Sequence, residues 1–342
     1  MKTDNTTEHR LSGLELAEKH VQTLSLVIYC MIIVFGTVGN GLVIYVTGFK
    51  MKKTVNSVWF LNLALADFLF TGFLIFSAVS LYQQHHWPFG KFMCKLNNFV
   101  SLVNMFASVF FLAAISLDRC LSIWVVVWAQ NKRTVRKAQV MSVVIWLVAG
   151  ICSTPYACFR TVIDNPDKTY CTYSVTKEED WSLNVFRFLM GFLIPFLAIL
   201  FSSVAVCIRS KHLHWKRKRR FHRIIFSIIF AFFICWLPFH VFIFIATNNP
   251  NLRSIVQIGG TLTVSLAFMN SCLNPLLYVF MCDEFQKKIK QSICFVLESA
   301  LTEDHFSFVS SRSLSSHFSR ISRKSDSAPP EEKATTLIFT ES

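Results

Sequence analysis

Charged residues are scarce in this chain. They make up 16% of its 342 residues, whereas hydrophobic residues make up 53% and include 35 phenylalanines. A soluble domain cannot bury so large an apolar fraction, so the composition excludes an ordinary water-soluble protein and indicates a membrane protein. We also expect no cleavable signal peptide, because residues 1–22 are polar and the first apolar run is long enough to span a bilayer. We therefore expect that run to act as its own anchor.

Seven apolar runs are long enough to cross about 30 Å of hydrocarbon. They cover residues 23–49, 57–82, 92–125, 138–158, 183–208, 221–247 and 254–281. The predicted fold class is an all-α membrane protein, a seven-transmembrane helix bundle. We expect residues 1–22 to form an extracellular segment, 23–281 the transmembrane domain, 282–297 a membrane-surface amphipathic eighth helix and 298–342 a disordered Ser-rich cytoplasmic tail.

Basic residues predict the orientation, because short loops rich in them stay cytoplasmic. They gather after the first, third and fifth runs: Lys50, Lys52, Lys53, Lys132, Arg133, Arg136, Lys137, Arg209, Lys211 and Lys216 to Arg220. The N terminus is therefore expected outside and the C terminus in the cytoplasm. Asn5 begins a glycosylation motif that fits this side. The net charge of +14 then reflects orientation and attraction to anionic membrane lipids, with no nucleic-acid partner.

A few polar residues lie within the runs at corresponding depths: Asn40, Asp67, Asn104, Ser108, Asn270, Ser271 and Asn274. A carboxylate at mid-membrane needs hydroxyl and amide partners or a cation. We expect a polar pocket that holds a sodium ion at Asp67 and no other metal. The alternative is a network that only fixes helix packing.

Three further features are hard to explain by packing alone. Asp118 and Arg119 stand side by side at the inner end of the third run, where charge is costly. The sixth run contains Phe232, Trp236 and Pro238, and the seventh ends in Asn-Pro-Leu-Leu-Tyr with Pro275 and Tyr278. A proline within a helix removes one hydrogen bond and permits a kink, so both runs contain a candidate hinge.

Taken in order, these motifs resemble those of the rhodopsin-like (class A) G-protein-coupled receptors over residues 20–297. They include Gly39-Asn40, Asp67, Asp-Arg-Cys from Asp118, Trp146, Pro195, Cys-Trp-Leu-Pro from Cys235 and Asn-Pro-x-x-Tyr from Asn274. The resemblance implies a plasma-membrane receptor that is not an enzyme. Outer ligand binding would move the sixth helix and open an inner cleft where Arg119 contacts a heterotrimeric G protein, of the inhibitory class.

Local segments are similar to the chemoattractant group, which includes formyl-peptide, chemerin and second prostaglandin D2 receptors. They are Leu117 to Cys120, Val127 to Val135 and Trp87 to Gly90. Phe49 to Asn56 favours a chemerin receptor, whereas Asn249 to Arg253 and the short third inner loop favour the prostaglandin receptor. The resemblance leaves the ligand open between a prostaglandin D2-like lipid acid and a carboxylate-bearing peptide such as chemerin or a formyl peptide.

Two positions depart from the family. Ser203 stands where an inner tyrosine is common, and Val126 stands where many relatives have proline. In addition, no acid lies between Lys211 and Arg223, so we expect Asp118 to restrain Arg119. These departures keep a non-signalling decoy receptor as an alternative. A transporter or channel is disfavoured, because the chain has no inverted repeat and no series of ionisable groups across the membrane.

The outer half of the bundle carries a candidate carboxylate anchor. Arg187 is the charged residue of the fifth run, and its side chain either reaches to the interface or faces the cavity to pair with a ligand carboxylate. Arg160 is a second candidate, with a solvated loop residue as the alternative. The third run lacks the acid of monoamine receptors, and the seventh lacks the lysine of retinal proteins. The remaining candidate ligand-binding residues are aromatic: Phe106, Trp236, Phe239 and His240.

Cys94 and Cys171 both fall on the predicted outer face, where an oxidising environment favours a disulfide between them. Cys294 is either a palmitoylation site or a buried residue of the amphipathic helix. Serines of the tail are expected kinase sites whose phosphates would engage arrestin: Ser310, Ser311, Ser313, Ser315 and Ser316.

Overall fold

The computed structural model describes residues 2–209, 215–248 and 253–281, most of which are helical. In chain order the elements are α1 (Lys2–Met31), the π-helical turn η1 (Ile32–Gly36), α2 (Thr37–Tyr45), η2 (Val46–Lys50), α3 (Val55–Tyr82), α4 (Gly90–Trp124), α5 (Val126–Lys132), α6 (Val135–Phe159), β1 (Arg160–Asp164), β2 (Thr169–Tyr173), α7 (Lys177–Phe188), η3 (Leu189–Leu193), α8 (Ile194–Arg209), α9 (Trp215–Asn248) and α10 (Arg253–Met281). The predicted eighth helix and tail lie outside the described residues.

Every predicted span falls on helix, and the predicted all-α membrane fold is confirmed. Five helical stretches of the described chain are long and apolar enough to cross a membrane: Gly13–Lys50, Val55–Tyr82, Gly90–Trp124, Val135–Phe159 and Lys177–Arg209. A shorter apolar stretch, Ala231–Thr247, lies within α9. The π-helical turn η1 joins α1 to α2, and η3 joins α7 to α8. The first and fifth predicted spans are therefore each continuously helical.

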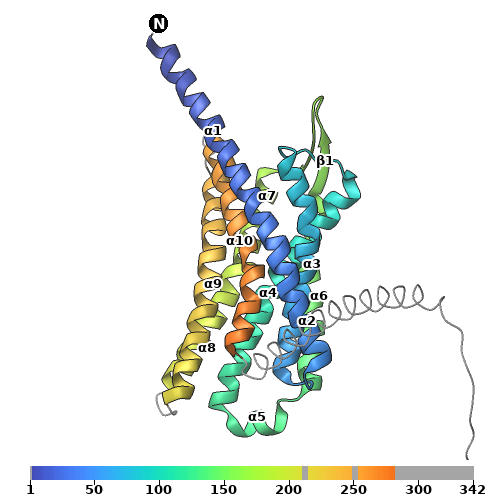
Figure 1. The fold of residues 1–342 in the computed structure, drawn as a ribbon, viewed down its shortest axis with the longest axis vertical. Coiled ribbons are helices and arrows are strands. Elements are labelled where there is room, and N and C mark those ends of the chain that lie inside the picture. The colour runs from blue at the N-terminus through green and yellow to red at the C-terminus, as the bar shows by residue number, and fades with distance from the viewer. Residues whose placement is uncertain (1, 210–214, 249–252, 282–342) are drawn as a thin grey trace, which may run out of the picture. The chain divides into compact units, whose positions relative to one another are not determined.

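The polar segment 1–22 is not separate from the first span. From Lys2 onward it belongs to α1, which continues into the apolar region and projects beyond the neighbouring helices (Figure 1). Leu, Glu and Lys, which recur in this segment, favour the helical state, so helix formation does not need to end where the apolar run begins.

Threonine side chains mark where several helices begin. Thr54 forms a reciprocal capping box with Ser57 at the start of α3, and Thr176 forms one with Glu179 at the start of α7. Thr134 accepts a hydrogen bond from the backbone of Lys137 at the start of α6. Each cap satisfies a backbone N–H that the first helical turn would leave unpaired.

Helix α4 lies at the centre of the bundle, where it packs against α3, α6 and α8, while α10 packs against α9 and α1. Phe106 and Phe111 of α4 are fully buried in this core. The indole of Trp146 on α6 donates to the Asn62 side chain of α3 across 3.0 Å, which fixes the register of those two helices. The β1–β2 hairpin lies at the end of the bundle where the chain begins, and α5 lies at the opposite end (Figure 1).

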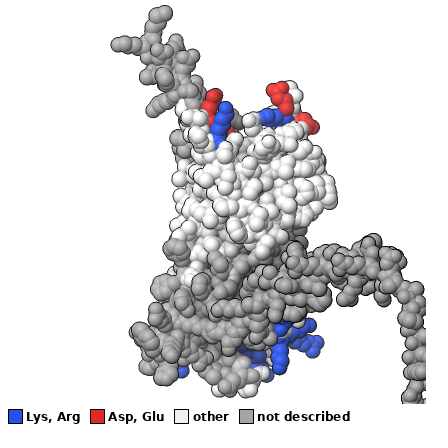
Figure 2. Space-filling model, viewed as in Figure 1, with Lys and Arg blue, Asp and Glu red and all other residues white. Residues whose placement is uncertain are grey.

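The charge distribution agrees with a membrane protein. Figure 2 shows a belt without charged side chains between one end that carries both signs and another where basic residues gather. Many large apolar side chains point outward within this belt, among them Val38 of α2 at 66% exposure and Ile151 of α6 at 70%. Such a surface is stable when it faces lipid.

Candidate functional site

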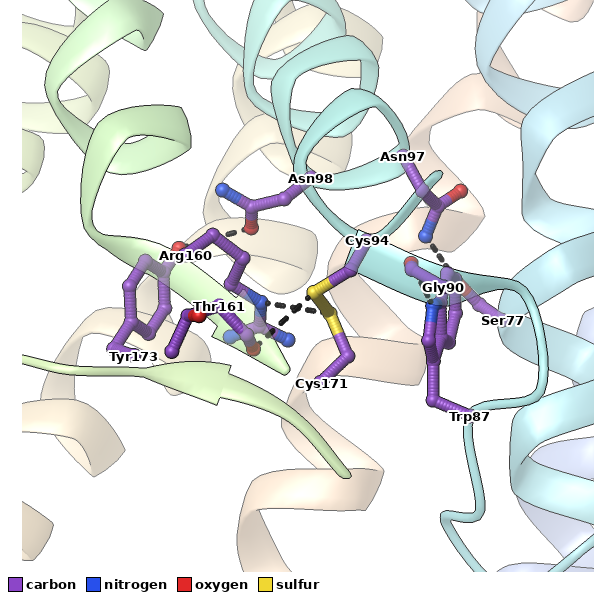
Figure 3. Close-up of a disulfide and its surroundings, with 10 residues drawn as sticks. All are labelled: Ser77, Trp87, Gly90, Cys94, Asn97, Asn98, Arg160, Thr161, Cys171 and Tyr173. Carbon is purple, nitrogen blue, oxygen red and sulfur yellow. Dashed lines mark hydrogen bonds between the residues drawn. A yellow bond between two sulfur atoms is a disulfide. The ribbon is translucent and has the colours of Figure 1, made fainter. Parts of the chain in front are cut away.

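The predicted disulfide is present and closes one end of the bundle. Cys94 at the start of α4 is bonded to Cys171 on β2, with their Cα atoms 5.7 Å apart (Figure 3). β2 pairs antiparallel with β1, and Cys171 lies opposite Val162. The hairpin is therefore attached both to α6, which leads directly into β1, and to α4.

Arg160, the first residue of β1, lies beside this disulfide. Its Nε donates to Cys171 Sγ across 3.3 Å, and its guanidinium lies 4.5 Å from the centre of the Tyr173 ring (Figure 3). Burial lowers the pKa of Arg160; Tyr173 opposes this effect and the positive charge of Arg187 adds to it. An arginine has so high an ordinary pKa that the group stays charged at neutral pH.

A cavity of about 740 Å³ opens beside Arg160, between the hairpin and the ends of α1, α3, α4 and α10. Arg160 is the charged side chain among the described residues that line it, and no lining residue is acidic. Asn97 and Asn98 of α4 contribute amides, and Tyr29 and Phe268 contribute apolar surface. The cavity is large enough for a drug-sized molecule or the end of a peptide, and its charge favours an anion.

Two residues that line this cavity have side-chain atoms with unused hydrogen-bonding capacity. Asn97 donates to Ser77 across 2.9 Å, and Asn98 accepts from the Tyr173 hydroxyl across 2.9 Å (Figure 3). This leaves the Asn97 Oδ1 acceptor and the Asn98 Nδ2 donor buried without a partner among the described residues. Buried polar atoms are costly when unpaired, so a ligand that supplies both a donor and an acceptor would be stabilised here.

Arg187, the other predicted anchor, turns into the bundle. Only 9% of it is exposed, and its guanidinium lies 4.6 Å from the Tyr156 ring centre and 5.9 Å from that of Phe239. Its Nε has no hydrogen-bond partner among the described residues. The side chain therefore packs on aromatic faces inside the protein, which is not the geometry of an arginine reaching outward along lipid.

The predicted ligand-binding residues thus fall into two groups. Arg160 lines the cavity, whereas the remaining ones cluster with Arg187 and are absent from its lining. In this second group the His240 ring centre lies 5.2 Å from Phe239 and 6.3 Å from Trp236. Phe106 lies 6.4 Å from Tyr156, which connects it to Arg187.

The polar residues of the spans do converge on Asp67, which is fully buried on α3. Asn274 of α10 donates to Asp67 Oδ2 across 2.6 Å, and Ser108 of α4 donates to Oδ1 across 3.3 Å. Asn104 lies between Asp67 and Ser271; with its amide nitrogen toward Asp67 it donates to Oδ1 across 3.0 Å and accepts from Ser271 across 3.1 Å. Three helices therefore share one carboxylate.

Asn40 and Asn270 complete the predicted set. Asn40 donates to the backbone oxygens of Gly36 and Ser271, each across 2.9 Å, and so joins α2 to α10. Asn270 is 2% exposed on α10. The side-chain oxygens of Asn40, Asn270 and Asn274 are buried without a hydrogen-bond partner among the described residues. The Asp67 carboxylate and the unpaired Oδ1 of Asn274, which donates to Asp67 through its Nδ2, are oxygen ligands of the kind that a small hard cation such as sodium prefers.

Near the end of α4 that is remote from the disulfide, Asp118 forms an ion pair with Arg133. The sequence identified Arg133 only as one of the basic residues that predict the orientation. Arg133 Nε donates to Asp118 Oδ1 across 2.9 Å, and Nη2 donates to Oδ2 across 2.7 Å. Nη2 also donates to Asn56 Oδ1 across 2.7 Å. Arg119 follows on α4 and is partly buried; its predicted restraint by Asp118 stays a prediction.

The predicted hinge residues lie on α9 and α10. Trp236 and Phe232 are buried on α9, where Phe232 stacks 5.3 Å from Phe192 of η3. Pro238 lies inside α9 and Pro275 inside α10. Tyr278 also belongs to α10, but its side chain lies outside the described residues.

Of the two positions that depart from the family, the structure describes the side chain of Ser203 but not that of Val126. Ser203 is buried on α8, and its hydroxyl donates to the Ile199 carbonyl of the same helix across 2.6 Å. Val126 begins α5, with its side chain outside the described residues. Asn5 lies within α1, and its side chain is likewise not described. The candidate modification sites Cys294, Ser310, Ser311, Ser313, Ser315 and Ser316 lie outside the described residues.

Comparison with known proteins agrees with this architecture. The family model described as 7 transmembrane receptor (rhodopsin family) matches residues 39–278. The chain is 39% identical to the C3a anaphylatoxin chemotactic receptor of Danio rerio, over 84% of this chain and 80% of the relative. It is 39% identical to Chemerin-like receptor 1 of Homo sapiens, over 86% and 84%, and 40% identical to Formyl peptide receptor 2 of Mus musculus, over 82% and 86%.

These relatives are receptors and not enzymes, and they belong to the chemoattractant group. Together with the helical bundle, the disulfide and the extent of the family match, they establish a multi-pass plasma-membrane protein whose partners are a G protein and an extracellular ligand. The chain belongs to the rhodopsin family of seven-transmembrane receptors, within its chemoattractant group.

Proposed function

We propose that the protein is a receptor for an extracellular anionic chemoattractant whose carboxylate binds Arg160, and that it signals through an inhibitory-class heterotrimeric G protein. The observation that carries this proposal is the cavity of about 740 Å³ whose lining contains a cation and no acid among the described residues. A carboxylate that leaves water for this cavity would regain its interactions in a charge-assisted pair with Arg160.

The chemistry of the cavity favours a peptide C terminus over a lipid acid. A peptide end brings a carboxylate for Arg160, an N–H for Asn97 Oδ1 and a carbonyl for Asn98 Nδ2. A prostaglandin D2-like acid brings the carboxylate and acceptors but fewer donors. The names of the relatives also favour peptides, because they include chemerin-like and formyl peptide receptors.

The cavity end is the extracellular side in this proposal. The disulfide and the glycosylation motif at Asn5 suit that side, whereas Arg133, Lys132 and Lys137 cluster by α5, on the cytoplasmic side. Sodium bound at Asp67 would act as an allosteric ion. Receptor kinases and arrestin would act on the tail serines named above.

The test is nucleotide exchange and ligand binding on cells that express the chain. We would compare a chemerin C-terminal peptide, a formyl peptide and prostaglandin D2, and each active peptide against its C-terminal amide. Arg160→Gln should weaken binding of the free acid at least about tenfold, the loss of roughly 1.4 kcal/mol, and should leave the amide unchanged. Lys91→Gln, which removes an exposed charge at the same end, is the matched control.

The other outcomes are equally informative. If Arg187→Gln and not Arg160→Gln separates acid from amide, the carboxylate reaches the deeper cluster. Equal loss of acid and amide in Arg160→Gln would contradict the proposed pairing. Ligand binding without nucleotide exchange would favour a non-signalling decoy. This alternative stays open because the hydroxyl of Ser203 donates to the Ile199 carbonyl of its own helix.

A further inference from the structure

Trp124 connects the inner ends of two helices. It is the last residue of α4, and its indole Nε1 donates to the backbone oxygen of Ala205 on α8 across 3.0 Å. The guanidinium of Arg209, the last residue of α8, lies 5.8 Å from the centre of the same indole. One side chain of α4 therefore makes a hydrogen bond and a cation–π contact with the last two turns of α8.

Other polar groups of α8 near this end are used within the helix. The hydroxyls of Ser202 and Ser203 donate to the carbonyls of Ala198 and Ile199, each across 2.6 Å. Ile199 and Val206 are buried and apolar. Apolar packing is not directional, so it leaves small sliding and tilting motions inexpensive, whereas the bond from Trp124 requires a particular alignment of the two helix ends.

The position of Trp124 gives this alignment a functional consequence. Trp124 follows Arg119 by five residues on α4, which corresponds to about 7.5 Å along the helix axis. The same stretch of α4 carries Asp118, which Arg133 holds in an ion pair. The end of α8 is therefore linked to the segment of α4 that carries Asp118 and Arg119, which we expect to face the G protein.

We propose that Trp124, Ala205 and Arg209 form an inner clasp that holds α8 on α4 while the receptor activates its G protein. Trp124 is then a positioning residue for activation. α4 and α8 pack against each other. In this proposal they move as one unit during activation, and α9 moves against them. The inner clasp stays closed in the active receptor and keeps this side of the G-protein site in place.

A distance measurement tests the inner clasp without a ligand or a G protein. Spin labels would be attached to cysteines that replace Leu121 on α4 and Ile208 on α8, two exposed positions. The cysteines outside the disulfide that are at least partly exposed in the described chain, together with Cys282 and Cys294, would first be changed to serine: Cys30, Cys120, Cys158, Cys207 and Cys272. The labelled parent should give one narrow distance distribution. Trp124→Phe, which keeps an aromatic ring but loses the N–H, should broaden and lengthen it, and Arg209→Gln should do so to a smaller extent.

Trp181→Phe is the matched control, because Trp181 is also a half-exposed tryptophan but belongs to α7. It should leave the distribution unchanged. An unchanged distribution in Trp124→Phe would overturn the inner clasp, even if the variant altered signalling.

Basal nucleotide exchange then tests the role in activation, again without a ligand. In purified receptor with its G protein, Trp124→Phe should lower the basal rate about fivefold, the factor that corresponds to the net contribution of one hydrogen bond. Surface expression and thermal stability should match those of Trp181→Phe. A higher basal rate would mean that the inner clasp opens during activation, and an unchanged rate would mean that Trp124 does not contribute to that step; either result overturns the proposed role.

Discussion

Arg133 forms a bidentate ion pair with Asp118: Nε donates to Oδ1 across 2.9 Å and Nη2 donates to Oδ2 across 2.7 Å. Nη2 also reaches Asn56, the second residue of α3, across 2.7 Å. Arg133 lies in the connection between α5 and α6, so its guanidinium joins that connection to both α3 and α4. The planar fork of arginine allows this arrangement, which the point charge of lysine cannot reproduce.

We predict that Arg133→Ala destabilises the receptor by about 1.5–3 kcal/mol, the range for a hydrogen bond to a charged group. Arg133→Lys should recover part of this loss, because lysine keeps the charge but not the two-pronged contact. Thermal unfolding of purified receptor would measure both. Arg136→Ala, which removes an exposed charge near the start of α6, is the control and should change the unfolding temperature little. Equal stability of Arg133→Ala and Arg136→Ala would contradict a structural role for the pair.

The oxygen-rich site at Asp67 predicts a specific response to sodium. Sodium should raise the unfolding temperature of the wild-type receptor more than potassium does, with a contribution of about 2.7 kcal/mol at a hundredfold excess over its dissociation constant. Asp67→Asn should abolish the difference, and Ser108→Ala should reduce it. Ser142→Ala is the matched control, because this buried serine bonds to its own helix at Ala138. A sodium response that survives in Asp67→Asn would show that the ion binds elsewhere.

The disulfide predicts a different pattern. Cys94→Ser, Cys171→Ser and the double variant remove the same bond, so all three should lose about 2–5 kcal/mol, and the losses should not add. Ligand affinity should fall with them, because both cysteines line the cavity. Thermal unfolding and binding would be measured side by side. Cys158→Ser changes an exposed free cysteine and should match wild type; additive losses would indicate a further role for one of the thiols.

The sequence predicted the helices, and it identified polar residues that hydrogen-bond to Asp67, namely Ser108 and Asn274, because both depend on patterns that are conspicuous in an apolar chain. Long apolar runs have few alternatives to membrane helices, and rare polar residues at equal depth meet when the helices pack. Arg133 and Trp124 could not be identified in this way. Each owes its role to a partner brought close by the tertiary fold, and in the sequence Arg133 was one of many basic loop residues.

The sequence left open which arginine lines a cavity, for a related reason. Arg160 and Arg187 are both cations near the outer end, and spacing alone does not tell which of them lines a cavity. The β1–β2 hairpin decides this: the disulfide holds it over α4, and the cavity lies next to Arg160, whereas Tyr156 and Phe239 enclose Arg187. Strands as short as β1 and β2 carry too few residues for a clear alternation of apolar and polar side chains. The sequence therefore predicted neither the hairpin nor its position beside α4.

His85, in the loop after α3, provides a prediction about pH. Its backbone has a φ of 66°, which ordinary L residues rarely adopt, and its Nε2 is buried without a hydrogen-bond partner among the described residues. Burial lowers the pKa of His85; Glu18 on α1 partly opposes this effect, and Lys168 adds to it. In the unfolded chain, by contrast, a histidine has a pKa of about 6.5.

The sign of the effect follows from this difference. Because the folded protein binds the proton less readily than the unfolded chain, the contribution of His85 to stability is complete above about pH 6.5 and is lost as the pH falls below that value. The unfolding temperature of the wild-type receptor should therefore drop more steeply between pH 7 and pH 5.5 than that of His85→Asn, by about 1–2 °C. Asparagine is the suitable replacement, because it tolerates a positive φ but does not titrate. His20→Asn, at an exposed position on α1, is the control and should follow wild type. If His85→Asn has the same acid sensitivity as His20→Asn, the proton that destabilises the receptor binds elsewhere.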